Sequence, residues 1–161
     1  MDKLPINNLG DLKKMNEEEL KSLALNIRKQ IINTVSKTGG HLSSNLGMVE
    51  LTIALHKVFD SPKDKIIFDV SHQTYAHKIL TGRILEEDSF RKMDGISGFT
   101  KKSESVHDAF EAGHSSTSIS AALAMSYVKE YDSGIGEIVA VIGDASITNG
   151  LAMEALNFLA T

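Results

Sequence analysis

The sequence predicts an α/β protein in which helices flank a wound parallel sheet. Two short β-rich runs, Lys65–Val70 and Ile138–Ile142, do not alternate between apolar and polar residues, as expected of strands buried on both faces of a parallel sheet. A helical pattern lies between them over Ser115–Tyr131, and another follows over Asn149–Leu159. Strand, helix, strand and helix in this order are typical of a wound α/β sheet.

Length and composition predict one domain with one compact core, because the chain has 161 residues, of which 42% are hydrophobic and 24% charged. No apolar run approaches the roughly 20 residues of a spanning helix. The net charge of −4 argues against a general nucleic-acid binder, and the lack of Cys excludes disulfides and thiolate metal sites. Residues Met1–Leu12 lack the apolar core of a signal peptide, so we predict a cytoplasmic protein without a membrane or nucleic-acid partner.

Two helices are expected before the first strand. Asn16 followed by Glu19 forms a capping-box pattern, so a helix should begin there and end at Gly39 and Gly40. A second helical pattern runs from about Asn45 to Val58. Later in the chain, Ser115–Tyr131 carries small and apolar residues around nearly its whole circumference, which predicts a buried helix.

Polar residues follow both predicted strands. In open parallel sheets, ligands bind beyond the carboxyl ends of the strands. Asp69–Gln73 follows the first strand and Gly143–Ser146 follows the second. Asp144 offers the carboxylate oxygens that Mg²⁺ prefers, but an Asp here can equally cap the next helix, and local spacing leaves both interpretations open.

The helix expected over Ser115–Tyr131 follows Gly113 and His114 and opens with four hydroxyl residues, Ser115 to Ser118. Such a start can bind a phosphate through side chains and N–H groups together. Ordinary N-capping by one serine is the alternative. We favour the ligand interpretation because a cap needs only one of the four hydroxyls.

Histidines supply further candidates for chemistry. We expect His56 to be structural and His77 to lie on a helix surface, and no pair has the HExxH zinc spacing, so a zinc hydrolase is a minority alternative. The histidines in predicted loops or turns, the better candidates for proton transfer, are His41, His72, His107 and His114.

Four motifs follow one another along the chain: Gly40–Gly47, Asp69–Gln73 with Tyr75–Arg83, Gly113–Ser120, and Gly143–Asp144 with Glu154–Asn157. Together and in this order they closely resemble the 1-deoxy-D-xylulose-5-phosphate synthases, thiamine-diphosphate enzymes related to the transketolases. The stretches Ser97–Thr100 and Glu104–Asp108 resemble a divergent, synthase-like branch of that family.

The resemblance implies a transferase that condenses pyruvate with glyceraldehyde 3-phosphate, releases CO₂ and feeds isoprenoid, thiamine and pyridoxal synthesis. Its cofactors would be thiamine diphosphate and Mg²⁺, and its usual state a homodimer. On the matched positions, Asp144 would ligate Mg²⁺, and His41 would face the substrates and assist proton transfer. The residues that would contact the cofactor are His72, Gly113, His114, Ser115, Ala145 and Ser146.

Two departures from the family pattern leave alternatives open. Ala145 stands where the family has Gly, and a Cβ there costs roughly 1 to 2 kcal/mol if the position needs a left-handed backbone. The family's second metal ligand, an Asn further along, has no match within residues 1–161. We therefore expect an N-terminal piece of the thiamine-diphosphate-binding domain that is inactive alone, exposes apolar surface and self-associates.

Two other classes of protein remain as alternatives. One is a sister transketolase-type enzyme, including the kind that is split into two polypeptides. The other is a non-catalytic remnant of the fold that has lost the cofactor, for which Ala145 is an argument.

Overall fold

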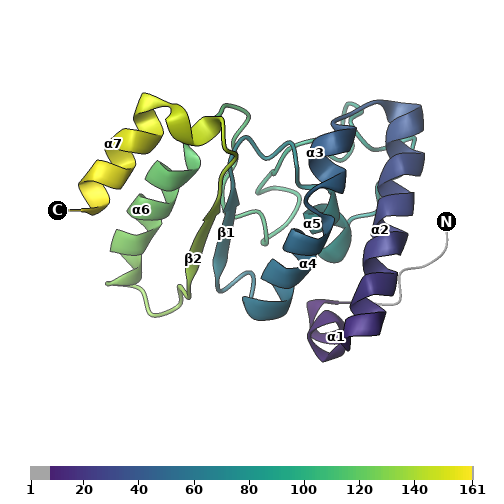
Figure 1. Cartoon of the computed structure of the whole chain (residues 1–161), viewed down its shortest axis with the longest axis horizontal. Helices are drawn as coiled ribbons and strands as arrows, with labels where there is room; N and C mark the ends of the chain where they lie inside the picture. The colour runs from purple at the N-terminus through teal and green to yellow at the C-terminus, as the bar shows by residue number, and fades with distance from the viewer. Residues whose placement is uncertain (1–7, 161) are drawn as a thin grey trace. The chain divides into compact units, whose positions relative to one another are not determined.

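The structure is a computed structural model that describes residues 8–160 (Figure 1). The chain forms two compact units instead of the single core expected from its length. The first unit comprises the described residues up to Phe59 together with His72–Gly98, and the second comprises Asp60–Ser71 and the chain from Phe99 onward. Each unit has a hydrophobic cluster of its own.

The first unit is helical. Its elements are α1 (Leu9–Lys14), α2 (Glu17–Thr38), α3 (Leu42–Leu46), α4 (Val49–Val58) and α5 (Tyr75–Leu80). The expected capping box starts α2: the Asn16 side chain accepts the Glu19 N–H at 3.0 Å, and the Glu19 carboxylate accepts the Asn16 N–H at 2.8 Å. Gly39 ends α2 with φ 71°, a conformation that favours glycine.

The single helix expected over Asn45–Val58 is in fact two, α3 and α4. The chain turns at Gly47 and Met48, where the Met48 N–H donates to the Asn45 carbonyl, three residues back, at 3.1 Å. The i to i−4 ladder of an α-helix is interrupted at this point. The break places Asn45 in a short helix of its own, next to His41.

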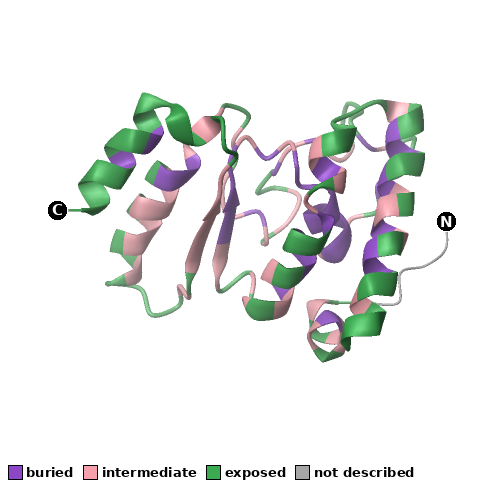
Figure 2. Cartoon of the chain, in the orientation of Figure 1, coloured by how far each residue is buried: buried purple, intermediate pink, exposed green. Residues whose placement is uncertain are grey.

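One face of α2 supplies much of the core of this unit, as its apolar spacing predicts (Figure 2). All six residues of α5 are buried as well. His56 is buried, which agrees with the structural role expected of it, but the prediction that His77 lies on the surface is wrong, because its ring is fully buried and stacks on His56. The Nε2 of His56 lies 2.8 Å from the Nδ1 of His77, so each imidazole gives the other a polar partner in the core.

The second unit is α/β. Its elements are β1 (Lys65–Phe68), α6 (Ser118–Lys129), β2 (Ile138–Val141), the 3₁₀ helix η1 (Ser146–Thr148) and α7 (Gly150–Leu159). The two strands are parallel, with Lys65 opposite Ile138 and Phe68 opposite Val141. This confirms the α/β class and the parallel direction. Both strands end earlier than expected, and β1 gives way to Val70 and Ser71, whose φ angles of 59° and 69° are left-handed.

Two predictions of burial in this unit are wrong. The strand β2 is only half-buried along its length, and in α6 only Ser118 and Ile119 are buried. The helix α6 contacts β1, β2 and α7, but these contacts leave Tyr127 and Val128 about half exposed (Figures 1 and 2). A helix whose residues are apolar all round is therefore not covered all round.

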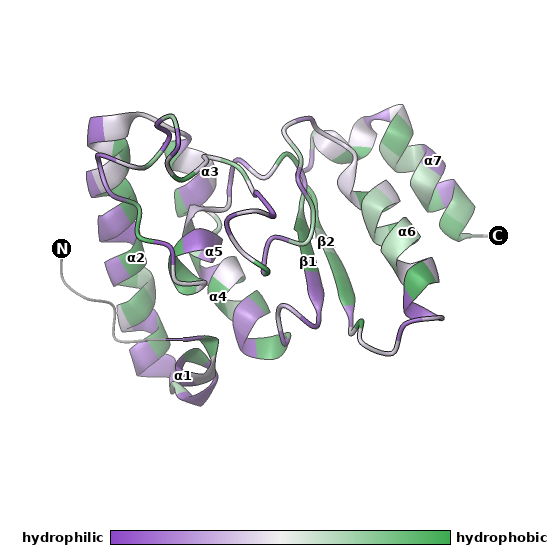
Figure 3. Ribbon diagram, turned by 180° about the vertical axis from the view of Figure 1, so that it is seen from behind, coloured by the Kyte–Doolittle hydropathy of each residue, from purple (hydrophilic) through white to green (hydrophobic). Residues whose placement is uncertain are grey.

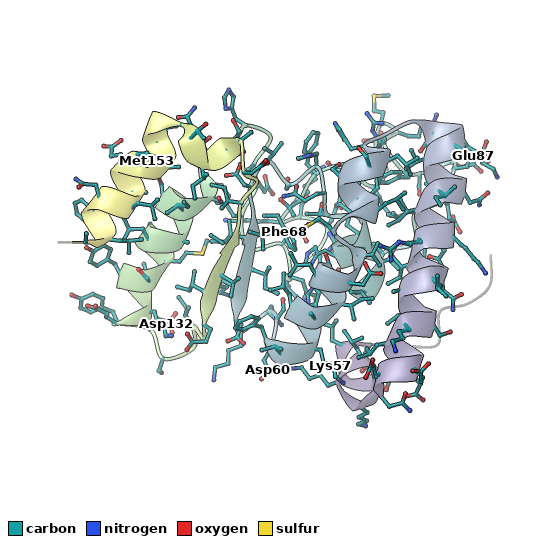
Figure 4. The ribbon with its side chains drawn as sticks, viewed as in Figure 1. Lys57, Asp60, Phe68, Glu87, Asp132 and Met153 are labelled. Carbon is teal, nitrogen blue, oxygen red and sulfur yellow. The ribbon has the colours of Figure 1, made fainter. Side chains whose placement is uncertain are left out.

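The outer face of α7 carries the exposed apolar surface that the sequence predicts (Figure 3). Met153, labelled in Figure 4, and Phe158 are among its exposed side chains. Ala152 and Ala155 face the other way and are buried against α6. Self-association through the apolar face stays a prediction. None of the described helices has the length and apolarity to cross a membrane.

Candidate functional site

A buried carboxylate organises the carboxyl end of the sheet in the second unit. Asp69 directly follows β1 and is 1% exposed. Its Oδ1 accepts the Ser116 N–H at 2.8 Å, and its Oδ2 accepts the Ser118 hydroxyl at 2.7 Å and the Ser118 N–H at 3.3 Å. The carboxylate thus caps the N-terminus of α6, where the helix dipole favours negative charge.

The same carboxylate reaches the turn after β2. Burial is the largest single influence on the pKa of Asp69 and by itself raises it, but hydrogen bonds from Ser116, Ser118 and the Ser146 side chain together hold that pKa below its usual value. The Ser116 hydroxyl also donates to the Ser146 carbonyl at 2.8 Å. The turns before α6 and after β2, far apart in the sequence, therefore lie side by side.

The hydroxyl residues at the start of α6 divide into two groups. Ser116 and Ser118 are fully buried and bonded to Asp69, so these two serve the fold and not a ligand. Thr117 occupies the N-cap position without a side-chain cap, and its buried Oγ1 has no hydrogen-bond partner among residues 8–160. Ser115 is half-buried. In this segment, the residues that remain candidates for ligand binding are Ser115, Thr117 and the preceding Gly113 and His114.

Gly113 and His114 precede this turn and are exposed. A Cβ built on Gly113 would meet no atom within 4 Å, so open space adjoins its backbone. The His114 Nδ1 lies 3.5 Å from the Ser115 carbonyl, a marginal contact that leaves the ring at the surface.

Asp144 lies exposed in the turn after β2. The alternative that it caps the next helix is wrong for α7, because the Asn149 side chain caps that helix by accepting the Leu151 N–H at 3.0 Å. Ala145 has φ −70° and ψ −37°, an ordinary right-handed conformation, so the cost of a left-handed Cβ does not arise. Replacement of the family's Gly by Ala therefore leaves this backbone unstrained.

The donors around this turn suit an anion accompanied by Mg²⁺. In the described part of the chain, no acceptor is found for the N–H groups of Asp144, Ala145 and Ser146. They lie beside a carboxylate that Mg²⁺ could bind and near the orphaned hydroxyl of Thr117. Within residues 8–160, no three His, Asp or Glu side chains are grouped so as to hold a metal ion on their own. The turn is therefore suited to a phosphate group whose own oxygens would complete the ligands of the Mg²⁺.

The first unit brings two of the predicted site residues together. His41 is exposed and His72 is half-buried, and their ring centroids lie 5.1 Å apart with the planes at 73°. The Tyr75 hydroxyl accepts the His41 N–H at 3.2 Å. His41 remains accessible to solvent in this edge-to-face pair.

Of the other loop histidines, His107 lies in the second unit, where its Nδ1 is 3.0 Å from the Ser61 hydroxyl. Both residues are half-buried. Sequence reasoning did not single out Asp69 and Asn45 as functional residues, although both lie inside the quoted motifs. The signal for Asp69 was an acidic residue at the very end of a buried strand.

A parallel α/β unit with polar turns at its strand ends is typical of a class of phosphate- and cofactor-binding proteins, and comparison with known proteins identifies the family. Residues 4–161 match the family model described as 1-deoxy-D-xylulose-5-phosphate synthase, and the chain belongs to that family.

Relatives with that name occur in several bacteria. The relative from Geobacillus sp. (strain WCH70) is 55% identical over 99% of this chain and 25% of its own length. The relative from Clostridium acetobutylicum is 56% identical over 92% of this chain and 24% of its own, and that from Rhodobacter capsulatus is 58% identical over 92% and 23%. The chain spans about a quarter of the length of these curated relatives.

Proposed function

We propose that the chain is the N-terminal part of the thiamine-diphosphate-binding domain of a 1-deoxy-D-xylulose-5-phosphate synthase. The proposed reaction is the condensation of pyruvate with glyceraldehyde 3-phosphate with loss of CO₂, which feeds isoprenoid precursor synthesis. The observation that carries the proposal is the pairing, through Asp69, of the Ser116–Ser118 turn with the Ser146 turn in a chain of this family. In this proposal, β1 and β2 belong to a larger wound parallel sheet.

The turn after β2 is the proposed binding site for the diphosphate of the cofactor. Asp144 would ligate Mg²⁺, and the N–H groups of Ala145 and Ser146 would donate to phosphate oxygens. Gly113–Ser115 would approach the same group across the open space beside Gly113. When bound, thiamine diphosphate supplies the electron sink for decarboxylation.

His41 and His72 are proposed to act in the first unit. Imidazole is the commonest proton-transfer group in enzymes, and the exposed position of the His41 ring suits it for proton transfer at the substrate. The ring of His72 packs edge to face against it and limits its orientation. His72 would itself line the cofactor site.

The proposed state is a cytoplasmic homodimer. The absence of Cys suits a reducing compartment. The exposed apolar side chains of α7, such as Met153 and Phe158, could be buried in an assembly.

The decisive experiment supplies the complete gene product with pyruvate, glyceraldehyde 3-phosphate, thiamine diphosphate and Mg²⁺ and follows deoxyxylulose phosphate and CO₂. We expect both products, and we expect Asp144→Ala to weaken Mg²⁺-dependent cofactor binding by at least about tenfold. The matched control is Asp132→Ala, since Asp132 is an exposed acid in the same unit, on the connection between α6 and β2 (Figure 4).

Other outcomes would contradict the proposal. Turnover of ketose donors alone would indicate a sister transketolase-type enzyme. Failure of the complete protein to bind thiamine diphosphate in a calorimetric titration would indicate a remnant without the cofactor.

A further inference from the structure

Asn45 lies fully buried on α3 and joins the backbones of the two predicted histidines. Its Nδ2 donates to the His41 carbonyl at 2.6 Å and to the His72 carbonyl at 2.8 Å. Its Oδ1 accepts the Tyr75 N–H at 2.8 Å. A single amide thus connects the turn before α3 to the stretch that leads into α5.

The chemistry of this position requires an amide. A planar carboxamide has two N–H donors and one carbonyl acceptor, and here both donors and the acceptor are used. A carboxylate at this position would place an oxygen where Nδ2 lies. That oxygen could not donate to the carbonyl oxygens of His41 and His72 and would be repelled by them. Because the two donors have a fixed angle between them, they fix the separation of the His41 and His72 backbones.

The segment before His41 does not hold itself in place. Gly39 and Gly40 have φ 71° and 144°, so this stretch has the conformational freedom of glycine. A Cβ at Gly40 would lie 2.9 Å from the Tyr75 hydroxyl, which leaves no room for a stiffer residue. The hydrogen bonds of Asn45 and Tyr75 hold the His41 backbone at the end of this glycine stretch.

We infer that Asn45 is a positioning residue that sets the edge-to-face geometry of the His41–His72 pair. The role of that pair in the reaction rests on the proposed function, whereas its geometry does not. Asn45 touches neither substrate nor cofactor in this inference and acts only through the two histidines.

The first test measures the geometry by NMR of the complete gene product with isotope-labelled histidine. In Asn45→Asp we expect the ring resonances of His41 and His72 to shift and the nuclear Overhauser contact between the rings to disappear. The buried His56–His77 pair reports whether the same unit remains folded, and its resonances should persist. The control Asn33→Asp makes the same chemical change at an exposed site on α2 and should leave all of these signals in place.

The second test measures turnover. Misplacement of an acid–base group by about 1 Å can cost about 100-fold, so we expect kcat of Asn45→Asp to fall by about 10- to 100-fold with KM for pyruvate little changed. Asn45→Ser, which adds no charge and retains one donor, should give an intermediate loss. A lower kcat with displaced histidine signals supports the inference.

Unchanged His41 and His72 signals in Asn45→Asp would overturn the inference. Loss of the His56–His77 signals in both Asn45 variants would also overturn it, because Asn45 would then serve general folding. If the wild-type protein makes no deoxyxylulose phosphate, the proposed function fails, while the ring geometry still decides the role of Asn45.

Discussion

Replacement of Asp69 by Asn gives the most direct test of the polar network at the sheet end. The substitution keeps the shape of the side chain but removes its charge and turns one acceptor into an N–H₂ donor. Asp69 accepts two backbone N–H groups, the Ser118 hydroxyl and the Ser146 side chain, so the single oxygen of an amide leaves at least one of these donors unsatisfied. At least one buried donor then loses its acceptor.

The magnitude follows from the kind of bond that is lost. A hydrogen bond to a charged group contributes about 1.5 to 3 kcal/mol, and the bonds that remain lose their charge assistance. We therefore expect Asp69→Asn to lower the free energy of unfolding by about 2 to 4 kcal/mol. Urea denaturation followed by circular dichroism measures this loss, and hydrogen exchange of the Ser116 and Ser118 amides locates it.

The pH dependence has a definite sign. Because the folded-state pKa of Asp69 is lowered, its contribution to stability is fully present above the unfolded pKa of about 3.9 and is lost as the pH falls through the folded-state pKa. The stability difference between wild type and Asp69→Asn should accordingly be constant near neutral pH and shrink in acid. A difference that grew as the pH fell would contradict the assigned direction.

The control is Asp132→Asn. Asp132 is exposed and accepts one backbone N–H, from Gly134 at 2.8 Å, so its replacement should cost no more than about 0.5 kcal/mol. If Asp69→Asn unfolded at the same urea concentration as this control, or if the Ser116 and Ser118 amides exchanged as in the wild type, the network would not carry the energy assigned to it.

Two further substitutions examine the neighbouring turns. Thr117→Val removes a buried hydroxyl that has no described partner, so it should be neutral or stabilising by up to about 1 kcal/mol in urea denaturation, and destabilisation beyond that would reveal a partner for the hydroxyl. Ala145→Gly should lower the free energy of unfolding by about 0.5 to 1 kcal/mol, because glycine loses more conformational freedom on folding. It should not raise the affinity for thiamine diphosphate in calorimetry, because Ala145 already has right-handed backbone angles. Tighter binding by the glycine variant would show that the Cβ obstructs the cofactor.

Features that depend on near neighbours could be predicted from the sequence. The capping box of Asn16 and Glu19 needs two residues three positions apart, and the end of α2 needs Gly39. The cores of β1 and β2 follow from runs of apolar and β-branched residues. In each case the residues that determine the structure lie within one turn or one strand.

Burial could not be predicted in the same way. The helix α5 contains His77 and Lys78, yet it is buried throughout, whereas α6 is mostly apolar and is half exposed. The type of a residue sets the free-energy cost of burying or exposing it, but tertiary packing decides which faces of a helix are buried. For His77 the compensating partner is His56, on a different helix and 21 positions away, which no local pattern reveals.

Tertiary partners also decide which residues of the site can bind a ligand. An internal carboxylate and a bound phosphate require the same donors at the start of a helix, so the sequence cannot distinguish them. Ser116 and Ser118 could serve either one, and only the fold shows that Asp69, 47 positions before Ser116, accepts the Ser116 N–H and both the N–H and the hydroxyl of Ser118. With negative charge already supplied at α6, a second anion at those same N–H groups would be repelled. Among residues 8–160 no such acceptor is found for the N–H groups of Asp144, Ala145 and Ser146. The proposed diphosphate site is therefore the turn after β2 and not the helix start at Ser116 and Ser118.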